Sequence, residues 1–431
     1  MAYKFKTLAL HAGITPDETG SRGVPLHRTA SYLFKNTEHA ANLFALKELG
    51  NIYTRIQNPT QDVLEQRVAA LENGAAALAL ASGTAAIFYT IINICSNGDE
   101  VVSTANLYGG TFTMFHNMLP EMGIKVKFVH PDKGEDIEKA ITAKTRLLFT
   151  ETIGNPSLDV ANLKELSAIA KKHHLPLAVD STFTTPYLLR PLDHGADIVI
   201  HSLTKWMGGH GTAIGGIVVD SGKFDWTDER FRLYNEPDPS YHNLRYAHDL
   251  GDLSALAFIL RMRVGPLRNL GACISPDNAW FFLQGLETLA LRMKAHCENG
   301  MKVAQFLLAH PKVAWVRYPG LESDPSHEVA TQLFENGYGG MVVFGARDGR
   351  KGGENFINRL GLISHLANVG DAKSLAIHPA STTHSQLTDD ELVEAGVTGD
   401  MVRLSVGIED ISDILEDIDQ ALGSQDPLGK T

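Results

Sequence analysis

The chain has 431 residues, of which 44% are hydrophobic and 20% are charged, and its formal net charge is −12. This length exceeds that of one compact core and predicts about two or three domains, while the composition is that of an ordinary soluble protein. The negative charge argues against a nucleic-acid or anionic-membrane surface, because a phosphate backbone requires a clustered basic face. We therefore expect small molecules or other copies of the chain as partners.

Residues 1–60 are predicted to form an irregular, polar arm that packs on something else. Glycines and prolines such as Gly13, Pro16 and Pro25 prevent long helices there. Helices and short apolar strands alternate over 61–265. Such alternation predicts an α/β domain with a mainly parallel sheet covered on both faces.

The expected strands of this sheet are short apolar segments that end in polar residues. They occupy 76–81, 100–103, 125–129, 145–151, 177–180 and 197–201. In such sheets the ligand lies at the carboxyl ends of the strands. The polar residues at or just beyond those ends are Ser82, Gly83, Thr84, Ser103, Glu151, Asp180, Ser202, Thr204 and Lys205. The sequence therefore predicts that these side chains meet at one edge of the sheet.

The second half of the chain is predicted to hold an insert and a smaller domain. The insert at 224–246 is aromatic and charged, and it is equally consistent with a lid over a site and with surface decoration. A long helix over 278–308 then leads into an α+β portion, assigned to residues 266–431, with strands at 313–318, 340–345 and 401–406.

Lys205 and Asp180 each follow a separate apolar run, and together they predict pyridoxal 5′-phosphate (PLP) as a cofactor. A lysine forms a Schiff base with the aldehyde of PLP, and an acidic residue keeps the ring nitrogen protonated so that the ring accepts electrons. Considered alone, Lys205 would be interpreted as a solvent-exposed lysine at the end of a strand. Asp180 would likewise be interpreted as the N-cap of a helix. Their occurrence together favours the cofactor.

Two segments can hold the phosphate of such a cofactor. Ser202 and Thr204 lie two positions apart in an extended segment, so their hydroxyls point the same way. Ser82-Gly83-Thr84 joins a strand to a helix, where free N–H groups and a glycine let an anion approach. The same three residues also suit an ordinary N-cap turn.

Aromatic and arginine side chains add candidates with open alternatives. Tyr108 lies in a glycine loop after a strand, where it can stack on a flat ring or pack as a turn aromatic. Tyr53 and Arg55 leave one face of an extended segment and can clamp a phosphate or form a surface pair. Arg403 lies in an apolar strand, which implies a carboxylate partner from the protein or from a substrate.

Cysteine and histidine usage predicts a cytoplasmic protein without a metal. Cys95, Cys273 and Cys297 are far apart and have no CxxC spacing, which predicts reduced and buried thiols. The first residues have too short an apolar stretch for a signal peptide, and no run of about 18 apolar residues occurs. The histidines show no convincing metal-ligand spacing.

These residues lie in motifs that resemble those of the Cys/Met-metabolism family of PLP enzymes. The resemblance extends from about Leu10 to Leu422 of this chain. The motifs are Tyr53-x-Arg55, Ser82-Gly83, Tyr108-Gly109, Glu151-x-x-x-Asn155-Pro156, Val179-Asp180, Ser202-x-Thr204-Lys205, the segment from His378 to His384, and Val402-Arg403 with the residues up to Gly407. The resemblance implies the aspartate-aminotransferase-like fold, known as fold type I.

The resemblance also implies a role for each matched residue. Lys205 is implied to be the Schiff-base lysine and the proton shuttle. Asp180 is implied to pair with the ring nitrogen, and Tyr108 to stack on the ring. These three residues form the implied catalytic set. Asn155 is implied to reach the phenolic oxygen of PLP, and Arg403 to bind the substrate α-carboxylate. The implied phosphate ligands are Ser82, Gly83, Thr84, Ser202 and Thr204, with Tyr53 and Arg55 contributed by the neighbouring subunit. The family is usually a tetramer of two such dimers.

Residues 366–375 resemble the O-acetylhomoserine sulfhydrylase branch of this family. Cystathionine enzymes have a Ser and a Glu where this sequence has Asn368 and Lys373, which weakens a cystathionine assignment and marks Asn368 as a substrate contact. The implied activity is γ-replacement on O-acetyl-L-homoserine by sulfide, giving homocysteine for methionine biosynthesis. The acyl group and the sulfur donor stay open. The alternatives are a methionine γ-lyase, a cystathionine γ-synthase-type enzyme, or a binding protein that has lost catalysis.

Overall fold

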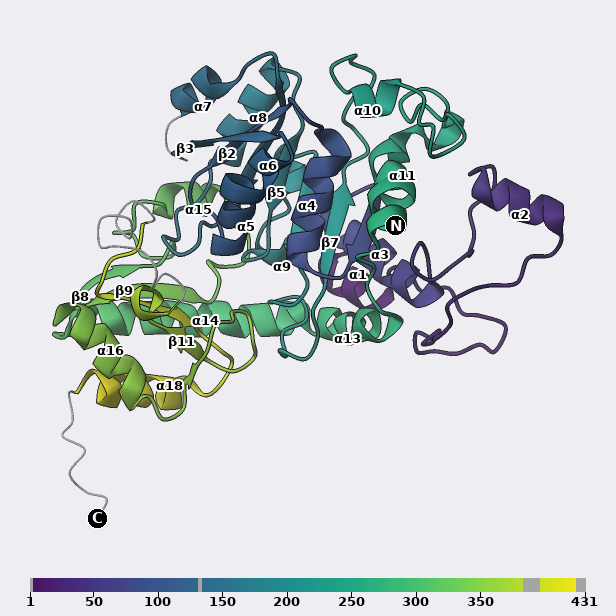
Figure 1. Cartoon of the computed structure of the whole chain (residues 1–431). Helices are drawn as coiled ribbons and strands as arrows, with labels where there is room; N and C mark the ends of the chain where they lie inside the picture. The colour runs from purple at the N-terminus through teal and green to yellow at the C-terminus, as the bar shows by residue number, and fades with distance from the viewer. Residues whose placement is uncertain (1–2, 131–133, 383–395, 424–431) are drawn as a thin grey trace.

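The computed structural model describes residues 3–130, 134–382 and 396–423. Figure 1 shows a large α/β part, a smaller part that ends in yellow α18 (Ile411–Leu422), and an N-terminal segment in which α2 (Thr37–Phe44) stands away from both. The preceding helix, α1 (Phe5–His11), instead packs on the large part against α3 (Pro59–Glu72). None of the helices in the described ranges is long and apolar enough to cross a membrane.

A seven-stranded sheet in the order β1-β7-β6-β5-β4-β2-β3 forms the centre of the large part. The five strands from β6 to β3 are parallel, whereas β7 is antiparallel to both β6 and β1. The α/β class with a mainly parallel sheet is thus confirmed. The strands are β1 (Ala76–Leu80), β2 (Glu100–Thr104), β3 (Lys125–Val129), β4 (Thr145–Glu151), β5 (Leu177–Asp180), β6 (Ile198–Ser202) and β7 (Gly216–Asp220).

Strand β7 is an addition to the strands expected from the sequence. No crossover helix separates it from β6, so an alternation of helices and strands does not mark it. It places Gly216 opposite Ser202. A Cβ atom at Gly216 would lie 2.1 Å from the Ser82 carbonyl oxygen, so only glycine lets the ends of β1, β6 and β7 approach this closely.

The sheet is buried on both faces, which explains the apolar runs of its central strands. In β5, Leu177 and Val179 join one core with helices such as α3 and α8, whereas Ala178 joins the other core with α4. Besides α1 and α3, the α-helices of this part are α4 (Gly83–Ile94), α5 (Gly109–Thr113), α6 (Leu119–Glu121), α7 (Gly134–Ala140), α8 (Leu163–Lys172), α9 (Thr185–Leu188), α10 (Arg232–Asn235), α11 (Ala257–Met262) and α12 (Arg268–Leu270).

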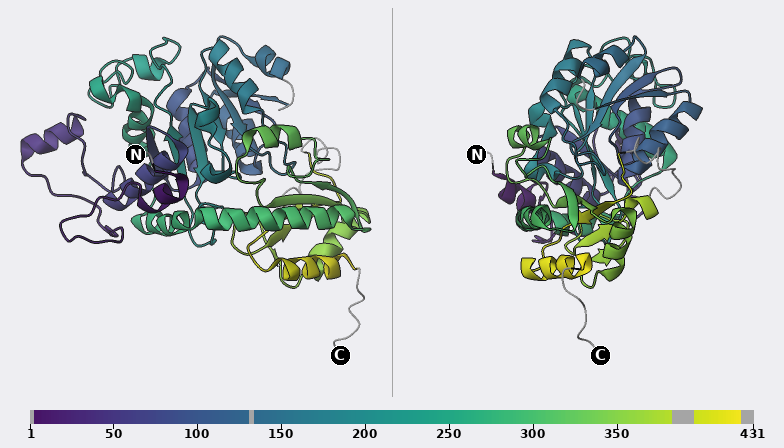
Figure 2. Two further views of the ribbon diagram at one scale, coloured as in Figure 1. Left: turned by 180° about the vertical axis from the view of Figure 1, so that it is seen from behind. Right: turned by 90° about the vertical axis from the view of Figure 1, so that its left-hand side faces the viewer.

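The smaller part is built on a five-stranded sheet in the order β10-β11-β12-β9-β8. The three C-terminal strands expected from the sequence are present as β8, β9 and β12. The elements are β8 (Val313–Arg317), β9 (Met341–Ala346), β10 (Ser364–His365), β11 (Leu375–Ile377) and β12 (Met401–Ser405), with α15 (His327–Leu333), α16 (Gly349–Arg359) and α18. In the left view of Figure 2, α14 (Leu289–Ala309) runs beneath the large part toward this sheet.

The expectation of one long helix over 278–308 is wrong, because two helices occupy this range. Helix α13 (Pro276–Glu287) is followed by Thr288, whose φ of −107° and ψ of 4° are not helical. Beside this break, Arg292 donates a hydrogen bond of 2.6 Å to the Gly285 carbonyl oxygen. A side chain there replaces the backbone N–H that a continuous helix would supply.

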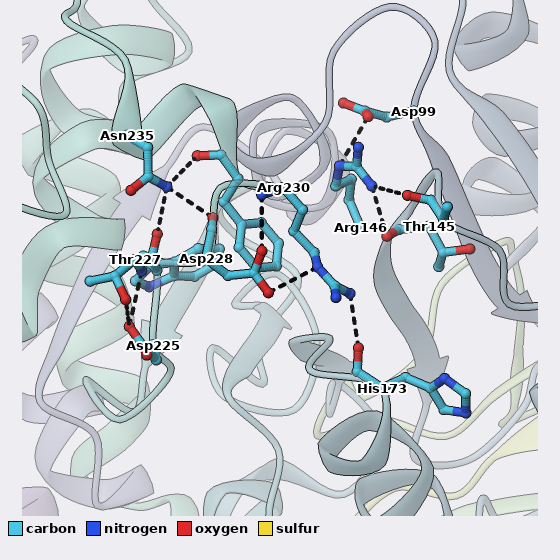
Figure 3. A network of polar contacts seen from close by, with 12 residues as sticks. Asp99, Thr145, Arg146, His173, Asp225, Thr227, Asp228, Arg230 and Asn235 are labelled. Atoms are coloured by element: carbon cyan, nitrogen blue, oxygen red, sulfur yellow. Dashed lines mark hydrogen bonds and ion pairs between the residues drawn. The ribbon is translucent and has the colours of Figure 1, made fainter.

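The 224–246 insert packs at the edge of the large sheet where the parallel strands begin. Trp226 stacks on Tyr234 with ring centroids 4.3 Å apart. Arg230 donates a hydrogen bond of 2.9 Å to the carbonyl oxygen of His173, which follows α8 and precedes β5. Figure 3 shows the bond of Arg230 to His173 beside the ion pair of Asp99 with Arg146. The insert therefore does not cover the opposite, carboxyl edge of its own subunit.

Candidate active site

The predicted polar residues converge at the carboxyl edge of the large sheet. Asp180 ends β5 and Ser202 ends β6, and Lys205 follows three residues later. The Thr182 hydroxyl accepts a hydrogen bond of 2.8 Å from the Ser202 N–H, and the Thr182 N–H donates one of 2.9 Å to Asp180 Oδ1. Thr182 thus joins the two strand ends.

The start of α4 lies directly against Ser202, as a phosphate cradle requires. A Cβ atom at Gly83 would lie 2.6 Å from the Ser202 Cβ, so a larger residue would push the helix away. Ser82 caps α4 by accepting a hydrogen bond of 3.0 Å from the Ala85 N–H. Thr204 Oγ1 accepts one of 3.1 Å from the Gly215 N–H. The positive end of the helix and the two hydroxyl-bearing segments therefore face one small region.

Thr84, the remaining member of the predicted phosphate set, is exposed on the first turn of α4. Its backbone position still lies within that turn, where N–H groups lack intrahelical partners. The structure thus brings Ser82, Gly83, Ser202 and Thr204 together and leaves the Thr84 side chain in solvent.

The amine of Lys205 is half-buried and held by a residue of the smaller part. Its Nζ donates a hydrogen bond of 2.6 Å to Asn368 Oδ1. Burial lowers the pKa of the lysine to about 8, and the nearby Arg403 cation adds to this shift. About a tenth of the amine is therefore uncharged at pH 7, a far larger fraction than for an ordinary lysine, and only this uncharged form is a nucleophile.

Arg403 faces the same region from β12. Its Nη1 donates a hydrogen bond of 2.8 Å to Asn155 Oδ1, an amide oxygen from the loop after β4. Burial lowers the pKa of this guanidinium to about 10, and no carboxylate of the described residues forms an ion pair with it. Arg403 is thus a desolvated cation that an incoming carboxylate would stabilise.

Two carboxyl groups lie side by side at the ends of β4 and β5. Glu151 and Asp180 are paired residues on these neighbouring strands, and their exposed fractions are only 8% and 9%. Burial raises the pKa of both carboxyl groups, and the charge of Asp180 raises that of Glu151 further. Glu151 Oε1 accepts a hydrogen bond of 2.8 Å from the Tyr108 N–H.

Tyr108 is placed at this edge, whereas Tyr53 and Arg55 are not joined to it. Tyr108 lies just before α5 and is 52% exposed. Arg55 donates to the Arg268 carbonyl oxygen, and its guanidinium lies 5.4 Å from the Tyr53 ring centroid. None of the contacts found among the described residues joins this pair to Lys205 or Asp180 of the same subunit.

The sequence analysis missed three residues that shape the site. Thr182 and Gly215 hold the segments that carry Asp180 and Thr204, and the spacing Asp-x-Thr is a signal for such a turn. Arg292 donates to the carbonyl oxygens of Trp206 and Met207, at 2.7 and 3.1 Å, and so fixes the segment after Lys205. No local pattern marks Arg292, which lies 87 residues further along the chain.

The histidines and cysteines have other roles. His378 is bonded to the Ser381 hydroxyl and the Gly399 carbonyl oxygen, and His384 lies outside the described residues. Cys95 and Cys297 are buried free thiols as expected, but Cys273 is only half-buried. Across the described residues, no group of three or more His, Cys, Asp or Glu side chains is arranged to hold a metal ion.

Comparison with known proteins agrees with this site. Residues 6–423 match the family profile described as Cys/Met metabolism PLP-dependent enzyme. An O-acetyl-L-homoserine sulfhydrylase of Leptospira meyeri is 53% identical over 97% of both chains. A homocysteine synthase of Schizosaccharomyces pombe is 50% identical, with 97% of this chain and 98% of the relative covered.

A crystal structure from Campylobacter jejuni, described as an O-acetylhomoserine (thiol)-lyase, superposes with a TM-score of 0.94. It is 41% identical, covers 97% of this chain and all of the other, and contains N′-pyridoxyl-lysine-5′-monophosphate. This chain therefore belongs to the Cys/Met metabolism family of PLP-dependent enzymes, and PLP is its cofactor. The lysine with a lowered pKa, the buried Asp180 and the Gly83 cradle fit that group.

Proposed function

We propose that this enzyme catalyses γ-replacement on O-acetyl-L-homoserine, with sulfide as nucleophile and homocysteine and acetate as products, a step of methionine biosynthesis. The observation that carries the substrate class is Arg403, a desolvated cation without a carboxylate partner among the described residues, next to the amine-bearing Lys205. An α-amino acid supplies both the missing anion and an amine for the cofactor. The names of the relatives support the particular reaction.

The side chains of the site suggest how the work is divided. PLP, when bound, supplies an electron sink that stabilises negative charge on the substrate α-carbon. We assign Asp180 to its ring nitrogen, Tyr108 to its ring face, Asn155 to its phenolic oxygen, and the Ser82, Gly83, Thr84, Ser202 and Thr204 segments to its phosphate. Each of these assignments rests on position at the common edge and on the family motifs.

Lys205 is assigned the removal of the substrate α-proton. Its lowered pKa allows the free amine to accept a proton near neutral pH. Arg403 would bind the α-carboxylate, with its guanidinium oriented by the bond to Asn155 Oδ1, and the 2.6 Å contact with Asn368 would hold the lysine amine on the substrate side. The exposed Tyr108 hydroxyl is the candidate for protonating the leaving group or the nucleophile.

A product assay tests the reaction. The purified enzyme is given O-acetyl- or O-succinyl-homoserine with saturating sulfide, and homocysteine is measured against 2-oxobutyrate. We expect homocysteine to dominate with the acetyl ester, because a replacement enzyme must keep water from the reactive carbon until sulfide arrives. Dominant 2-oxobutyrate and ammonia, or cleavage of methionine faster than conversion of the ester, would establish a γ-lyase instead.

We also propose that two subunits build each site and that two such dimers form a tetramer. The segment before α3 exposes large apolar residues, with Leu33 99% and Leu49 55% exposed, and it lines a cavity of about 430 Å³ together with Tyr241 and Arg268. Exposed apolar surface of this kind favours contact with another chain. Tyr53 and Arg55 lie in this segment and would reach the partner's phosphate site. The cytoplasmic location stays a prediction.

Subunit mixing tests the shared site. Arg55→Ala and Lys205→Ala parents are each expected to be inactive, and hybrids are expected to regain about a quarter to a half of wild-type activity, because one site then has both residues intact. A mixture of Arg55→Ala with wild type serves as the dilution control. If mass measurement confirms exchange and activity does not return, Arg55 does not act across the interface.

A further inference from the structure

Glu151 is a buried carboxyl group that the proposed chemistry leaves without a role. It ends β4 beside Asp180, and paired residues on neighbouring strands direct their side chains to the same face of a sheet. The two groups thus lie together at the site edge. Each has an exposed fraction below 10%, so water screens the repulsion between their negative charges only weakly.

The hydrogen-bond partners of the two groups differ. Burial raises the pKa of Asp180, but the bond from the Thr182 N–H and the nearby His201 side chain offset part of this rise, so its charged form is supported. Glu151 accepts one bond, from the Tyr108 N–H, while burial and the charge of Asp180 raise its pKa well above the ordinary range. When two close carboxyl groups compete, the one with less support for its charge keeps the proton.

The backbone of Tyr108 has its anchor on Glu151. Tyr108 precedes α5 and makes no side-chain cap for it. Its ring lies over Gly110, where a Cβ atom would be 2.6 Å from the ring. The 2.8 Å bond from its N–H to Glu151 therefore links the loop that carries the ring to the strand end next to Asp180.

We propose that Glu151 is a positioning residue that acts as a neutral carboxylic acid: its carbonyl oxygen holds the Tyr108 loop against the cofactor ring, and its neutrality leaves Asp180 as the charged partner of the ring nitrogen. The inference rests on the roles proposed for Tyr108 and Asp180. In this proposal Glu151 contacts neither cofactor nor substrate, but it holds Tyr108, which contacts the cofactor ring.

The experiment compares Glu151→Gln with Glu151→Leu in the PLP-bound enzyme. Glutamine keeps a neutral group and the acceptor for the Tyr108 N–H, so the pH midpoint of the visible absorbance of the lysine-linked cofactor should stay within about 0.3 units of wild type. Leucine removes the acceptor, so the visible circular dichroism should weaken and the PLP dissociation constant, measured by titrating the apoenzyme, should rise on the order of tenfold. If Glu151→Leu does not fold, Glu151→Ala replaces it with the same expected loss.

Two outcomes would overturn the inference. A fall of about one pH unit in the midpoint of Glu151→Gln would mean that a negative charge had been removed, so Glu151 is ionised. Unchanged dichroism and PLP affinity in Glu151→Leu would mean that the bond to Tyr108 positions nothing. Glu100→Leu is the matched control, since Glu100 is also 8% exposed but lies at the opposite edge; it should lose thermal stability without altering the cofactor signals.

A Tyr108→Leu variant separates this inference from the proposed site. If Tyr108→Leu changes the cofactor dichroism and Glu151→Leu does not, the role of Glu151 fails while that of Tyr108 stands. If neither variant changes it, the assignment of Tyr108 to the ring fails, and the inference fails with it.

Discussion

The two edges of the large sheet each carry a buried glutamate, but the pKa values of the two carboxyl groups are shifted in opposite directions. Glu100, at the edge where the strands begin, and Glu151, at the edge where they end, are both 8% exposed. Hydrogen bonds from Lys127 at 2.7 Å and Thr142 at 2.6 Å hold the pKa of Glu100 below its ordinary value. Burial and a second carboxylate raise that of Glu151.

The difference shows that buried charged groups with charged partners stabilise the fold, whereas desolvated cations without such partners in the described ranges mark the candidate active site. At the first edge the charged groups are matched locally, as in the ion pair of Asp99 with Arg146 and the contacts of Arg230 in Figure 3. At the second edge Lys205 and Arg403 are desolvated and bonded only to neutral amides among the described residues. Burying such cations without an anionic partner costs free energy of folding, so their presence at this edge indicates a ligand-binding site.

The largest effect is expected from Lys205→Ala. Removal of the amine should abolish the visible absorbance of lysine-linked PLP and reduce kcat by at least about 10³-fold, even if the cofactor still occupies the cradle. Lys223→Ala, an exposed lysine next to β7 at the first edge, is the control and should keep both signals. Turnover close to wild type in Lys205→Ala would remove the basis for the site.

Arg403→Leu is expected to weaken substrate binding next most strongly. Loss of the cation should raise KM for O-acetylhomoserine by about 10- to 150-fold, corresponding to roughly 1.5–3 kcal/mol for a charge-assisted contact. Arg230→Leu removes an arginine at the other edge and should lower stability without changing KM. Equal KM changes in the two variants would contradict the contrast between the edges.

The pH dependence of cofactor loading tests the lowered pKa of Lys205. Only the uncharged amine attacks the aldehyde, so the rate of PLP attachment to apoenzyme should rise about tenfold per pH unit below pH 8 and level off above it. Stopped-flow absorbance from pH 6.5 to 9.5 measures this rate. A rate that still increases about tenfold per unit up to pH 9.5 would show that burial does not lower the lysine pKa.

Asp220 is a buried carboxyl group at the first edge without a matching cation in the described part of the chain, and its replacement is expected to have the smallest effect on activity. Burial, with a contribution from Asp197, raises its pKa to about 7, and its Oδ2 has no hydrogen-bond partner among the described residues. The unfolded chain ionises at lower pH than the folded one, so stability is lost as pH rises from about 4 to about 7.

Asp220→Asn should remove this loss. A pKa rise of about three units corresponds to roughly 4 kcal/mol, so at pH 8 the free energy of unfolding of this variant is expected to exceed that of wild type by up to about 4 kcal/mol. The difference should disappear near pH 4. Urea denaturation at several pH values measures it, with Asp225→Asn, an exposed turn residue, as the control. A pH-independent difference would mean that Asp220 is already ionised in the folded protein.

Much of the site could be predicted from sequence because its parts lie in short local patterns. Asp180, Ser202 and Lys205 each follow an apolar strand, and a parallel sheet brings strand ends to one edge whatever the details of packing. The α/β class, the family and the cofactor followed from these segments and are confirmed. The roles of individual residues and the domain boundaries stay predictions.

Other features depend on contacts between distant segments, which no local pattern encodes. Strand β7 is placed by antiparallel pairing, and the break at Thr288 by the geometry around Arg292. The bond of Lys205 to Asn368 spans 163 residues. The sequence by itself thus determined which polar residues follow the strand ends, because strand ends and glycine turns are local patterns. Only the tertiary structure decided in which direction the pKa of each group is shifted, because burial and neighbouring charges come from distant segments.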